Sequence, residues 1–414
     1  MTHPSEPPPI HPAFSLFPVV GGHLCVGGIP LQALAEQAGG TPFYVYDRSK
    51  ITERVHLLRR HFPSELKLHY AVKANPMPAV VSHLAGLVDG ADVASGGELT
   101  GAKAAGFCAA ETSFAGPGKR PEELAQAVEW GALVHVESVR EVDILSRLAD
   151  ELGRSPRVAV RVNPDFGLKH SGVKMGGGPQ PFGVDAEQVP ALLAEIGRRR
   201  LTFEGFHIFS GSQNLQSAAI VESQNLSLEL AIRLAASAPS LVRGVNIGGG
   251  FGIPYFPGDR PLDLAPIGDN LRRWMDPLRR ALPEARVTLE LGRYLVGEAG
   301  LYVTRILDRK VSRGKTFLVV DGGMHHHLAA SGHFGQVIRK NFPVAIGNRM
   351  GESSTETVSI VGPLCTPMDL LGDSVSLPRA QVGDFVVVFQ SGAYGFTASP
   401  QRFLSHPPPA EILV

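Results

Sequence analysis

Short apolar runs alternate with amphipathic segments between residues 66 and 291. The runs are rich in valine, leucine, isoleucine and phenylalanine, and their length is typical of buried strands. We therefore predict one strand for each run. The eight predicted strands are 66–72, 91–94, 112–115, 133–136, 157–162, 203–209, 244–247 and 286–291.

Most of the segments between these strands have the period of an α-helix. Ser138, followed three residues later by Glu141, has the capping-box pattern that starts a helix. Alternating strands and helices predict a parallel α/β domain, and eight strands are the number that closes a (β/α)8 TIM barrel. We expect this barrel in preference to an open, doubly wound sheet. Among the predicted helices are 79–87, 98–105, 121–130, 138–152, 186–199 and 218–238.

The pattern changes after Gly292, where apolar or alternating runs follow one another with few helical segments between them. Such runs predict a mostly antiparallel β domain, which the early runs 17–21 and 43–45 are expected to join. Its predicted strands are 301–310, 316–321, 357–361 and 385–390. The expected parts are a flexible proline-rich tail (1–14), N-terminal strands of the β domain (15–46), the barrel (47–295) and the C-terminal β domain (296–414).

Composition narrows the class of protein. Lysine plus arginine and aspartate plus glutamate number 39 each, so there is no basic field to attract nucleic acid or anionic lipid. No window approaches the roughly 18 consecutive apolar residues of a membrane span. The N-terminus lacks the pattern of a secretory signal, and three distant cysteines suggest no disulfide framework. We expect a cytoplasmic protein that binds neither nucleic acid nor membrane.

The sequence Tyr-Ala-Val-Lys-Ala-Asn-Pro-Met at 70–77 places Lys73 at the end of an apolar strand. Burial lowers the pKa of an amine, and a lowered pKa is what a Schiff-base lysine requires. The alternative is a strand that reaches the surface and leaves its last lysine in solvent.

Other polar residues stand where the predicted strands end, which is the catalytic rim of a barrel. Glu290 would need a cationic partner or an N–H donor there, and His207 is either a core histidine or a ring that stacks on a flat cofactor. The glycine run 248–250 is either a phosphate-binding turn or a plain tight turn. The candidate rim residues besides Lys73 are Asp92, His207, Ser210, Gly248, Gly249, Gly250, Glu290, Gly292 and Arg293.

The predicted β domain contributes two further features. Cys365 lies in a loop bounded by glycine and proline, which is unusual for a packing cysteine, whereas Cys25 and Cys108 are interpreted as structural. Three consecutive histidines at 325–327 suggest a metal site, but adjacent side chains seldom converge on one ion, so we expect no metal.

Together these motifs resemble the fold-type III pyridoxal-phosphate decarboxylases, the family of diaminopimelate and ornithine decarboxylases, over about residues 40–400. The resemblance implies an alanine racemase-like barrel, pyridoxal 5'-phosphate as cofactor, and a homodimer with shared active sites. It implies that Lys73 forms the Schiff base, that Glu290 holds the pyridine nitrogen, and that His207 stacks on the ring. It also implies that Cys365 enters the partner subunit's site as a proton donor.

The remaining roles also follow from the resemblance. Asp92 would lie near the cofactor, and the phosphate would be bound by Ser210 and by Gly248, Gly249 and Gly250. In the Glu-x-Gly-Arg motif, Gly292 precedes Arg293, which would bind phosphate or the substrate carboxylate. Tyr394, in Gly-Ala-Tyr, would bind phosphate or substrate.

The chain departs from the family pattern where substrate is chosen. Thr366 follows Cys365, where diaminopimelate and ornithine decarboxylases have an acid, and the histidines stand near the usual Arg-Pro-x-x-Tyr segment. The sequence is closer to a biosynthetic-cluster subgroup that acts on carrier-linked or modified amino acids. We therefore expect a decarboxylase for an amino acid or a carrier-protein-bound aminoacyl group. A diaminopimelate or basic amino acid decarboxylase, a racemase of the same fold and an inactive regulator are the alternatives.

Overall fold

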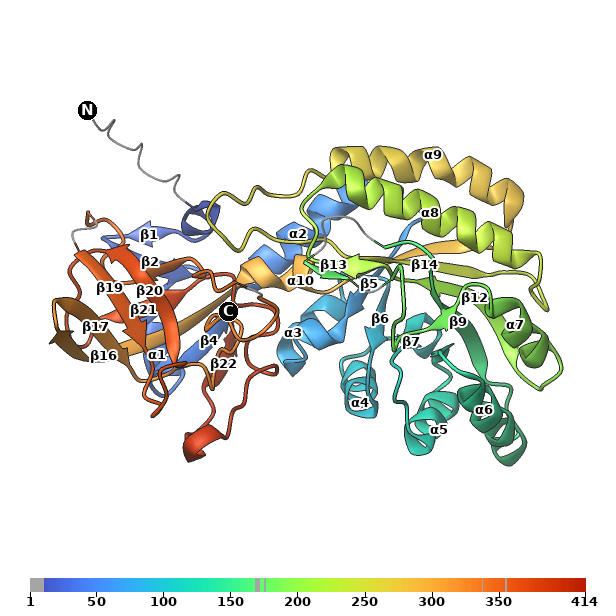
Figure 1. Cartoon of the computed structure of the whole chain (residues 1–414), viewed down its shortest axis with the longest axis horizontal. Helices are drawn as coiled ribbons and strands as arrows, with labels where there is room; N and C mark the ends of the chain where they lie inside the picture. The colour runs from blue at the N-terminus through green and yellow to red at the C-terminus, as the bar shows by residue number, and fades with distance from the viewer. Residues whose placement is uncertain (1–10, 168–171, 175, 337, 354–355) are drawn as a thin grey trace. The chain divides into compact units, whose positions relative to one another are not determined.

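The computed structural model describes residues 11–167, 172–174, 176–336, 338–353 and 356–414, and the chain divides into two compact units (Figure 1). Unit 1 comprises Met1–Ile51, Pro254–Pro261 and Val296–Val414, and unit 2 comprises Thr52–Ile253 and Leu262–Leu295. None of the helices in the described residues has the length and apolar character that a membrane crossing requires.

Unit 2 is built around a closed ring of eight parallel strands. Each strand pairs with its neighbour in chain order, and pairing of the last with the first closes the barrel. The predicted strands and the barrel are thus confirmed, and the open sheet is excluded. The strands are β5 (Lys67–Ala71), β6 (Gly90–Val93), β7 (Thr112–Phe114), β8 (Leu133–Val136), β9 (Arg157–Asn163), β12 (Thr202–Ile208), β14 (Gly244–Gly249) and β15 (Arg286–Leu291).

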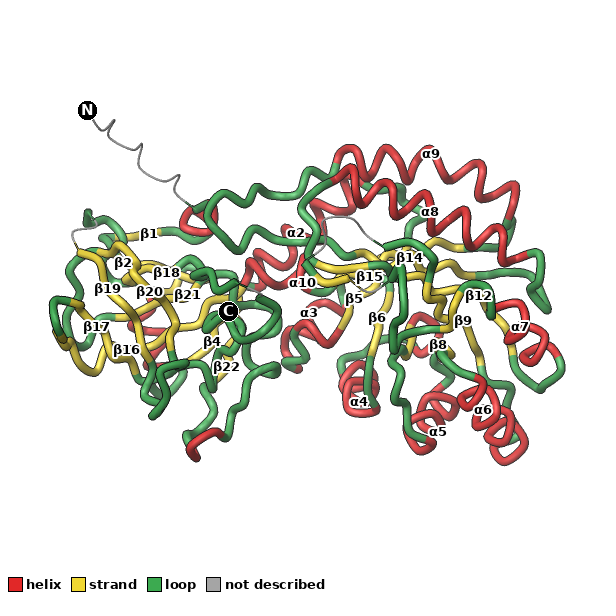
Figure 2. Tube along the Cα trace, viewed as in Figure 1, coloured by secondary structure: helices red, strands yellow, loops and turns green. Residues whose placement is uncertain are grey.

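Helices surround these strands (Figure 2). The Ser138 side chain accepts a hydrogen bond from the Glu141 N–H at 3.4 Å, as its capping pattern predicts. α9 was not predicted, although its residues Ile267, Leu271 and Leu278 are buried. The helices are α2 (Arg48–His61), α3 (Pro78–Ala85), α4 (Gly96–Ala104), α5 (Pro121–Trp130), α6 (Val139–Leu152), α7 (Val189–Gly197), α8 (Ser217–Ala235), α9 (Ala265–Ala281) and α10 (Arg293–Val296).

Unit 1 has a mostly antiparallel sheet in the order β18-β21-β16-β17-β19-β20, with β4 pairing β16 and β22. Among the strand pairs of this sheet in the described residues, β17–β19 and β22–β4 are parallel and the others are antiparallel. The four strands predicted after Gly292 are confirmed, and the run at 43–45 joins this sheet as β4. The strands are β4 (Phe43–Tyr46), β16 (Gly300–Ser312), β17 (Lys315–Val320), β18 (Val344–Ile346), β19 (Glu356–Val361), β20 (Leu370–Leu377), β21 (Phe385–Val388) and β22 (Ala410–Leu413).

The run at 17–21 contributes only β1, which belongs to a separate three-stranded sheet. Residues 1–10 of the predicted tail lie outside the described residues, whereas residues 12–15 form a short 3-10 helix in which Ala13 is buried. The smaller elements are β1 (Val19–Val20), β2 (His23–Val26), β3 (Ile29–Pro30), α1 (Leu31–Gln37), β10 (Val173–Lys174), β11 (Val184–Asp185) and β13 (Gly211–Ser212).

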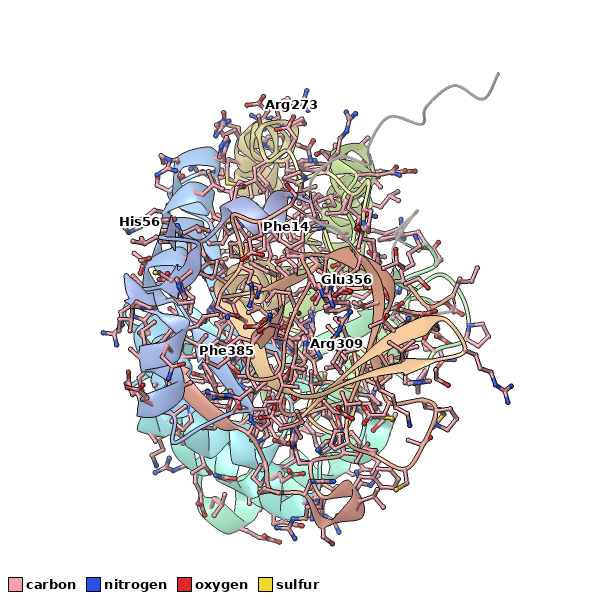
Figure 3. The ribbon with its side chains drawn as sticks, turned by 90° about the vertical axis from the view of Figure 1, so that its left-hand side faces the viewer. Phe14, His56, Arg273, Arg309, Glu356 and Phe385 are labelled. Carbon is pink, nitrogen blue, oxygen red and sulfur yellow. The ribbon has the colours of Figure 1, made fainter. Side chains whose placement is uncertain are left out.

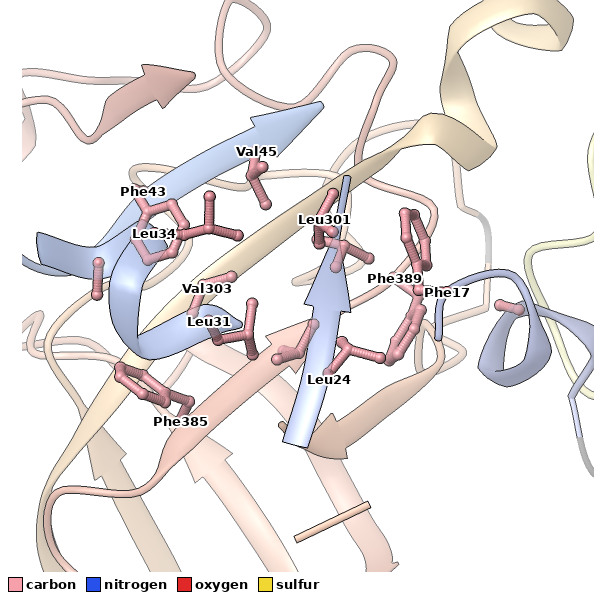
Figure 4. Packing of buried hydrophobic residues seen from close by; sticks show 14 residues of the cluster. Phe17, Leu24, Leu31, Leu34, Phe43, Val45, Leu301, Val303, Phe385 and Phe389 are labelled. Atoms are coloured by element: carbon pink, nitrogen blue, oxygen red, sulfur yellow. The ribbon is translucent and has the colours of Figure 1, made fainter. Parts of the chain in front are cut away.

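The core of unit 1 lies between the N-terminal segment and the sheet. Leu31 and Leu34 of α1 pack with Phe43, Val303 and other buried side chains of the same cluster (Figure 4). On β16 and β19, Arg309 and Glu356 form a bidentate pair with N–O distances of 2.7 and 2.6 Å (Figure 3). Burial of the apolar cluster supplies the main stabilisation of this unit.

The pairing of β12 with β14 in the barrel includes a close backbone approach. Gly205 of β12 has a φ of +155°, and a Cβ there would collide with the carbonyl oxygen of Gly244 on β14. A Cβ at Gly244 itself would meet nothing within 4 Å. Glycine is therefore required on one side of this strand pair and not on the other.

We predict that Gly205→Ala lowers the free energy of unfolding by about 2–3 kcal/mol, because the new methyl group must push two paired strands apart. Gly244→Ala, the matched control, should change it by less than about 1 kcal/mol. Denaturant unfolding followed by circular dichroism measures both values. Equal effects of the two substitutions would contradict the close approach.

Candidate functional site

The turn that carries Lys73 follows β5 directly. The strand ends at Ala71, and a single 3-10 turn, Val72–Ala74, replaces the longer strand that the sequence predicts. The Tyr70 hydroxyl donates to the Asn75 carbonyl at 2.8 Å and holds this turn against the strand. Because all barrel strands are parallel, the turn lies at the rim where the other strands also end.

Lys73 is not the desolvated lysine that the sequence suggested. Its side chain is 43% exposed, because the chain leaves the strand before reaching it. The amine lies 3.8 Å from Oε1 of Glu290, whose side chain is only 6% exposed. A neighbouring negative charge, and not burial, is therefore the dominant feature of the lysine's surroundings.

Glu290 is the centre of the rim. This residue of β15 has Oε2 at 3.4 Å from Nε2 of His207, and the Asn246 amide donates to the same oxygen at 3.5 Å. An amine, an imidazole and an amide thus surround one buried carboxylate. Such a carboxylate is suited to bind and hold a proton or a cationic nitrogen.

Asp92 of β6 adds a second buried carboxyl group. It accepts a hydrogen bond from the Ser113 hydroxyl at 2.8 Å. Burial, and secondarily the charge of Glu290, raise the pKa of Asp92 well above its usual value, while Lys73 acts in the opposite direction. Lys73 therefore interacts favourably with both buried carboxyl groups.

His207 presents a neutral ring. Burial, together with the neighbouring His135, lowers the pKa of His207 well below its usual value. Neither ring nitrogen has a hydrogen-bond partner within the described chain, and the ring centroid lies 4.4 Å from that of His135. A neutral, flat imidazole in this position fits stacking on an aromatic ring.

The end of β12 meets the glycine turn after β14. The hydroxyls of Ser210 and Ser223 are 2.7 Å apart, and both line a cavity that Gly249 also lines. Gly248 and Gly250 have φ values of +65° and +73°, which favour glycine. Two hydroxyls beside such a turn are a suitable phosphate site.

Gly292 allows β15 to approach the lysine turn. A Cβ at this position would lie 2.8 Å from the Cβ of Ala74. The next residue, Arg293, begins α10 and is half-buried. The predicted rim residues are thus brought together, with this glycine as the contact between the segment that carries Glu290 and the segment that carries Lys73.

The sequence analysis missed a buried charged cluster at the ends of β7, β8 and β9. Glu137 accepts hydrogen bonds from Arg161 at 3.0 Å and from the N–H groups of Gly116 at 2.6 Å and Gly183 at 2.9 Å. Lys119 lies 3.8 Å from the same carboxylate. The signal was available, since Arg161 is a lone charge near the end of an apolar strand, as Lys73 is.

Cys365, Thr366 and Tyr394 belong to unit 1. Cys365 is exposed, and the Thr366 hydroxyl accepts a hydrogen bond from the Met368 N–H at 3.3 Å. Tyr394 has a φ of +54°, a strained conformation for a residue other than glycine. These three roles stay predictions.

The three histidines are interior side chains of unit 1. Their exposed fractions are 0, 2 and 0%, and burial lowers the pKa values of His325, His326 and His327 to about 3, 4 and 3. Within the residues the structure covers, no cluster of three or more histidine, cysteine or acidic side chains is arranged to hold a metal ion. Because the three side chains are buried, the structure does not support the expectation that this segment selects the substrate.

The rim of unit 2 fits pyridoxal phosphate by its donor set. Lys73 offers an amine, Glu290 a buried carboxylate for the pyridine nitrogen, and His207 a flat ring whose nitrogens bind nothing else that is described. Ser210 and the glycine turn offer a phosphate site. The group's aldehyde, ring and phosphate therefore each meet a suitable partner.

Comparison with known proteins supports the same chemistry. The family model "Pyridoxal-dependent decarboxylase, pyridoxal binding domain" matches residues 48–297. L-glutamyl-(BtrI acyl-carrier protein) decarboxylase of Niallia circulans is 39% identical over 90% of this chain and 88% of its own. Diaminopimelate decarboxylase of Aquifex aeolicus is 35% identical over 95% and 91%. The crystal structure of diaminopimelate decarboxylase from Helicobacter pylori with L-lysine has a TM-score of 0.80 at 28% identity, covering 92% of this chain and 94% of that one.

Proposed function

The chain belongs to the pyridoxal-dependent decarboxylases and is a carboxy-lyase that uses this cofactor, and from that premise we propose how its residues act and on what. The observation that supports the proposal is the group formed by Lys73, Glu290 and His207, with separations of 3.8 and 3.4 Å. An amine and an imidazole beside one buried carboxylate match the requirements of a pyridoxal site. We keep residues 47–295 as the proposed extent of the cofactor-binding barrel.

Each rim residue has a proposed task. Lys73 would hold the cofactor through its amine. Glu290 would hold a proton at the pyridine nitrogen, and the flat ring of His207 would pack against the cofactor ring. Ser210 and the turn at 248–250 would hold the phosphate. When bound, the cofactor supplies the electron sink for loss of the α-carboxylate.

Asp92, Gly292, Arg293 and Tyr394 complete the proposed site. The raised pKa of Asp92 means that it keeps a proton more readily than an ordinary aspartate, so it adds less negative charge beside Glu290. Arg293 is the proposed ligand of phosphate or of the substrate carboxylate, and Gly292 places it. Tyr394 is a proposed phosphate or substrate ligand.

The proposed substrate is an aminoacyl group on a carrier protein, with the L-glutamyl group as the first candidate. The N. circulans relative that acts on such a group is 39% identical, against 35% for the A. aeolicus diaminopimelate decarboxylase. Thr366 stands where diaminopimelate enzymes have an acid, and its hydroxyl already caps the Met368 N–H. A distal ammonium therefore lacks its usual partner.

Return of the proton needs a donor, and Cys365 is the proposed one. We propose a homodimer in which Cys365 serves the partner subunit's site, and its exposure in the single chain agrees with this.

A cytoplasmic location also stays a prediction.

We predict that carbon dioxide release is fastest with L-glutamyl carrier protein. Free L-glutamate and meso-diaminopimelate should give kcat/KM values at least about 100-fold lower, because neither presents the carrier-linked group to the site. The measurement is a release assay with all three substrates, with Lys73→Ala as the blank. Efficient turnover of free diaminopimelate would contradict the substrate assignment, and racemisation without carbon dioxide would contradict the reaction.

Mixing two inactive variants tests the shared site. Lys73→Ala and Cys365→Ala should each lose activity by about 10²-fold or more, because each removes a group that acts on the reacting atoms. Each mixed dimer contains one site with both groups intact, and a mixture of equal parts in which subunits pair at random should regain up to about a quarter of wild-type activity. No recovery in dimers shown by mass spectrometry to be mixed would contradict a shared site.

A further inference from the structure

A buried carboxylate of unit 1 has no place in the chemistry proposed above. Asp369, just before β20, is 2% exposed and forms no ion pair with any lysine or arginine that the structure describes. Burial raises the pKa of Asp369, although two backbone N–H donors and His406 oppose that shift. An acid in such a position is costly unless its oxygens bind donors.

The two oxygens of Asp369 bind two different segments. Oδ1 accepts a hydrogen bond from the Met324 N–H at 2.6 Å, and Oδ2 accepts one from the Leu364 N–H at 2.9 Å. The first donor immediately precedes the three histidines, and the second immediately precedes Cys365. One side chain thus joins the histidine turn to the cysteine loop.

Two glycines leave room for this carboxylate. A Cβ at Gly323 or at Gly362 would collide with the Asp369 carboxylate. The Gly362 N–H also donates to the Asp369 carbonyl at 3.0 Å, and the Asp369 N–H donates to the Thr366 carbonyl at 3.2 Å. The loop that carries Cys365 is therefore closed on Asp369 from both sides.

The histidine turn extends the connection to Tyr394. His327 Nε2 lies 2.9 Å from the hydroxyl of Ser391, three residues before Tyr394, and the Leu328 N–H donates to the Ser399 hydroxyl at 2.9 Å. Tyr394 itself is held at a φ of +54°. A strained conformation persists only where its surroundings fix it, and these hydrogen bonds lie on both sides of it.

We propose that Asp369 is a positioning residue that fixes the Cys365 loop to the histidine turn, and that His327 fixes the Tyr394 segment to the same turn. The histidine turn is then the interior support of both segments, through the Met324 N–H for the cysteine loop and through His327 for the Tyr394 segment. This inference rests on the proposed function of Cys365, but the contacts themselves lie within unit 1 and can be tested separately.

The main variant is Asp369→Asn in the cofactor-loaded enzyme. The amide keeps the shape but offers only one acceptor oxygen, so one of the two N–H donors loses its partner. Asp373→Asn is the matched control. This carboxylate also lies near the start of β20, but it binds the Ser359 hydroxyl at 2.7 Å and Lys315 at 2.9 Å and not the cysteine loop.

The first readout is independent of catalysis. Alkylation of Cys365 by iodoacetamide is measured by peptide mass spectrometry as a ratio to the exposed Cys108 of unit 2 in the same sample. Cys365, exposed in the single chain, is covered in the proposed dimer, so release of the loop in Asp369→Asn should raise this ratio about threefold or more, because local opening returns the thiol to solvent. An unchanged ratio, or an equal rise in Asp373→Asn, would overturn the proposal.

The second readout is the rate of carbon dioxide release. In Asp369→Asn, kcat should fall about 10- to 100-fold with KM changed less than about twofold, because the proton donor is displaced while binding remains. The solvent deuterium isotope effect on kcat should also rise, since proton return becomes slower. A fall in kcat with an unchanged isotope effect would indicate general loss of folded enzyme and would overturn the positioning role.

Two results separate this inference from the proposed function. Loss of activity on Lys73→Ala tests the function, whereas the alkylation ratio tests the contacts of Asp369 whatever the substrate is. If Asp369→Asn does not fold, hydrogen exchange of the wild-type holoenzyme takes its place. Peptides that report the Met324 and Leu364 amides should exchange slowly, and complete exchange within seconds would overturn the proposal.

Discussion

The pairing of β15 with β5, which closes the barrel, is the constraint on which the rest of the site depends. It places Glu290 opposite His69 in register and so brings its carboxylate to within 3.8 Å of the Lys73 amine, although the two residues are far apart in sequence. Gly292 permits the approach, since any side chain there would press on the Ala74 methyl group. The electrostatics of Asp92 and His207 follow from the same closure.

In unit 1, side chains of the interior hold two loop segments in place. Cys365 and Tyr394 lie in loops, and loops that carry function need rigid support. Asp369 and His327 supply it through hydrogen bonds to backbone N–H groups and to a serine hydroxyl. A buried, neutral histidine can serve this purpose because its ring nitrogens act as both donor and acceptor.

The sequence predicted the barrel because each of its strands is a separate apolar run with helical segments on either side. It did not predict α9, whose start is crowded with prolines, or the exposure of Lys73, because the shift from strand to 3-10 turn at residue 72 depends on local geometry that apolar runs do not encode. Arg161 and Glu137 were missed although they carry the same signal as Lys73. The burial of the three histidines depends on tertiary packing and has no local signature.

We propose that buried Glu290 keeps a proton on the pyridine nitrogen of the cofactor. Nitrogen-15 NMR of enzyme loaded with cofactor labelled at that ring atom tests it directly. In the wild-type enzyme the chemical shift should be that of a protonated pyridine, and in Glu290→Gln that of an unprotonated one, because an amide cannot hold the proton. A protonated nitrogen in both proteins, or an unprotonated one in the wild type, would contradict this role of Glu290.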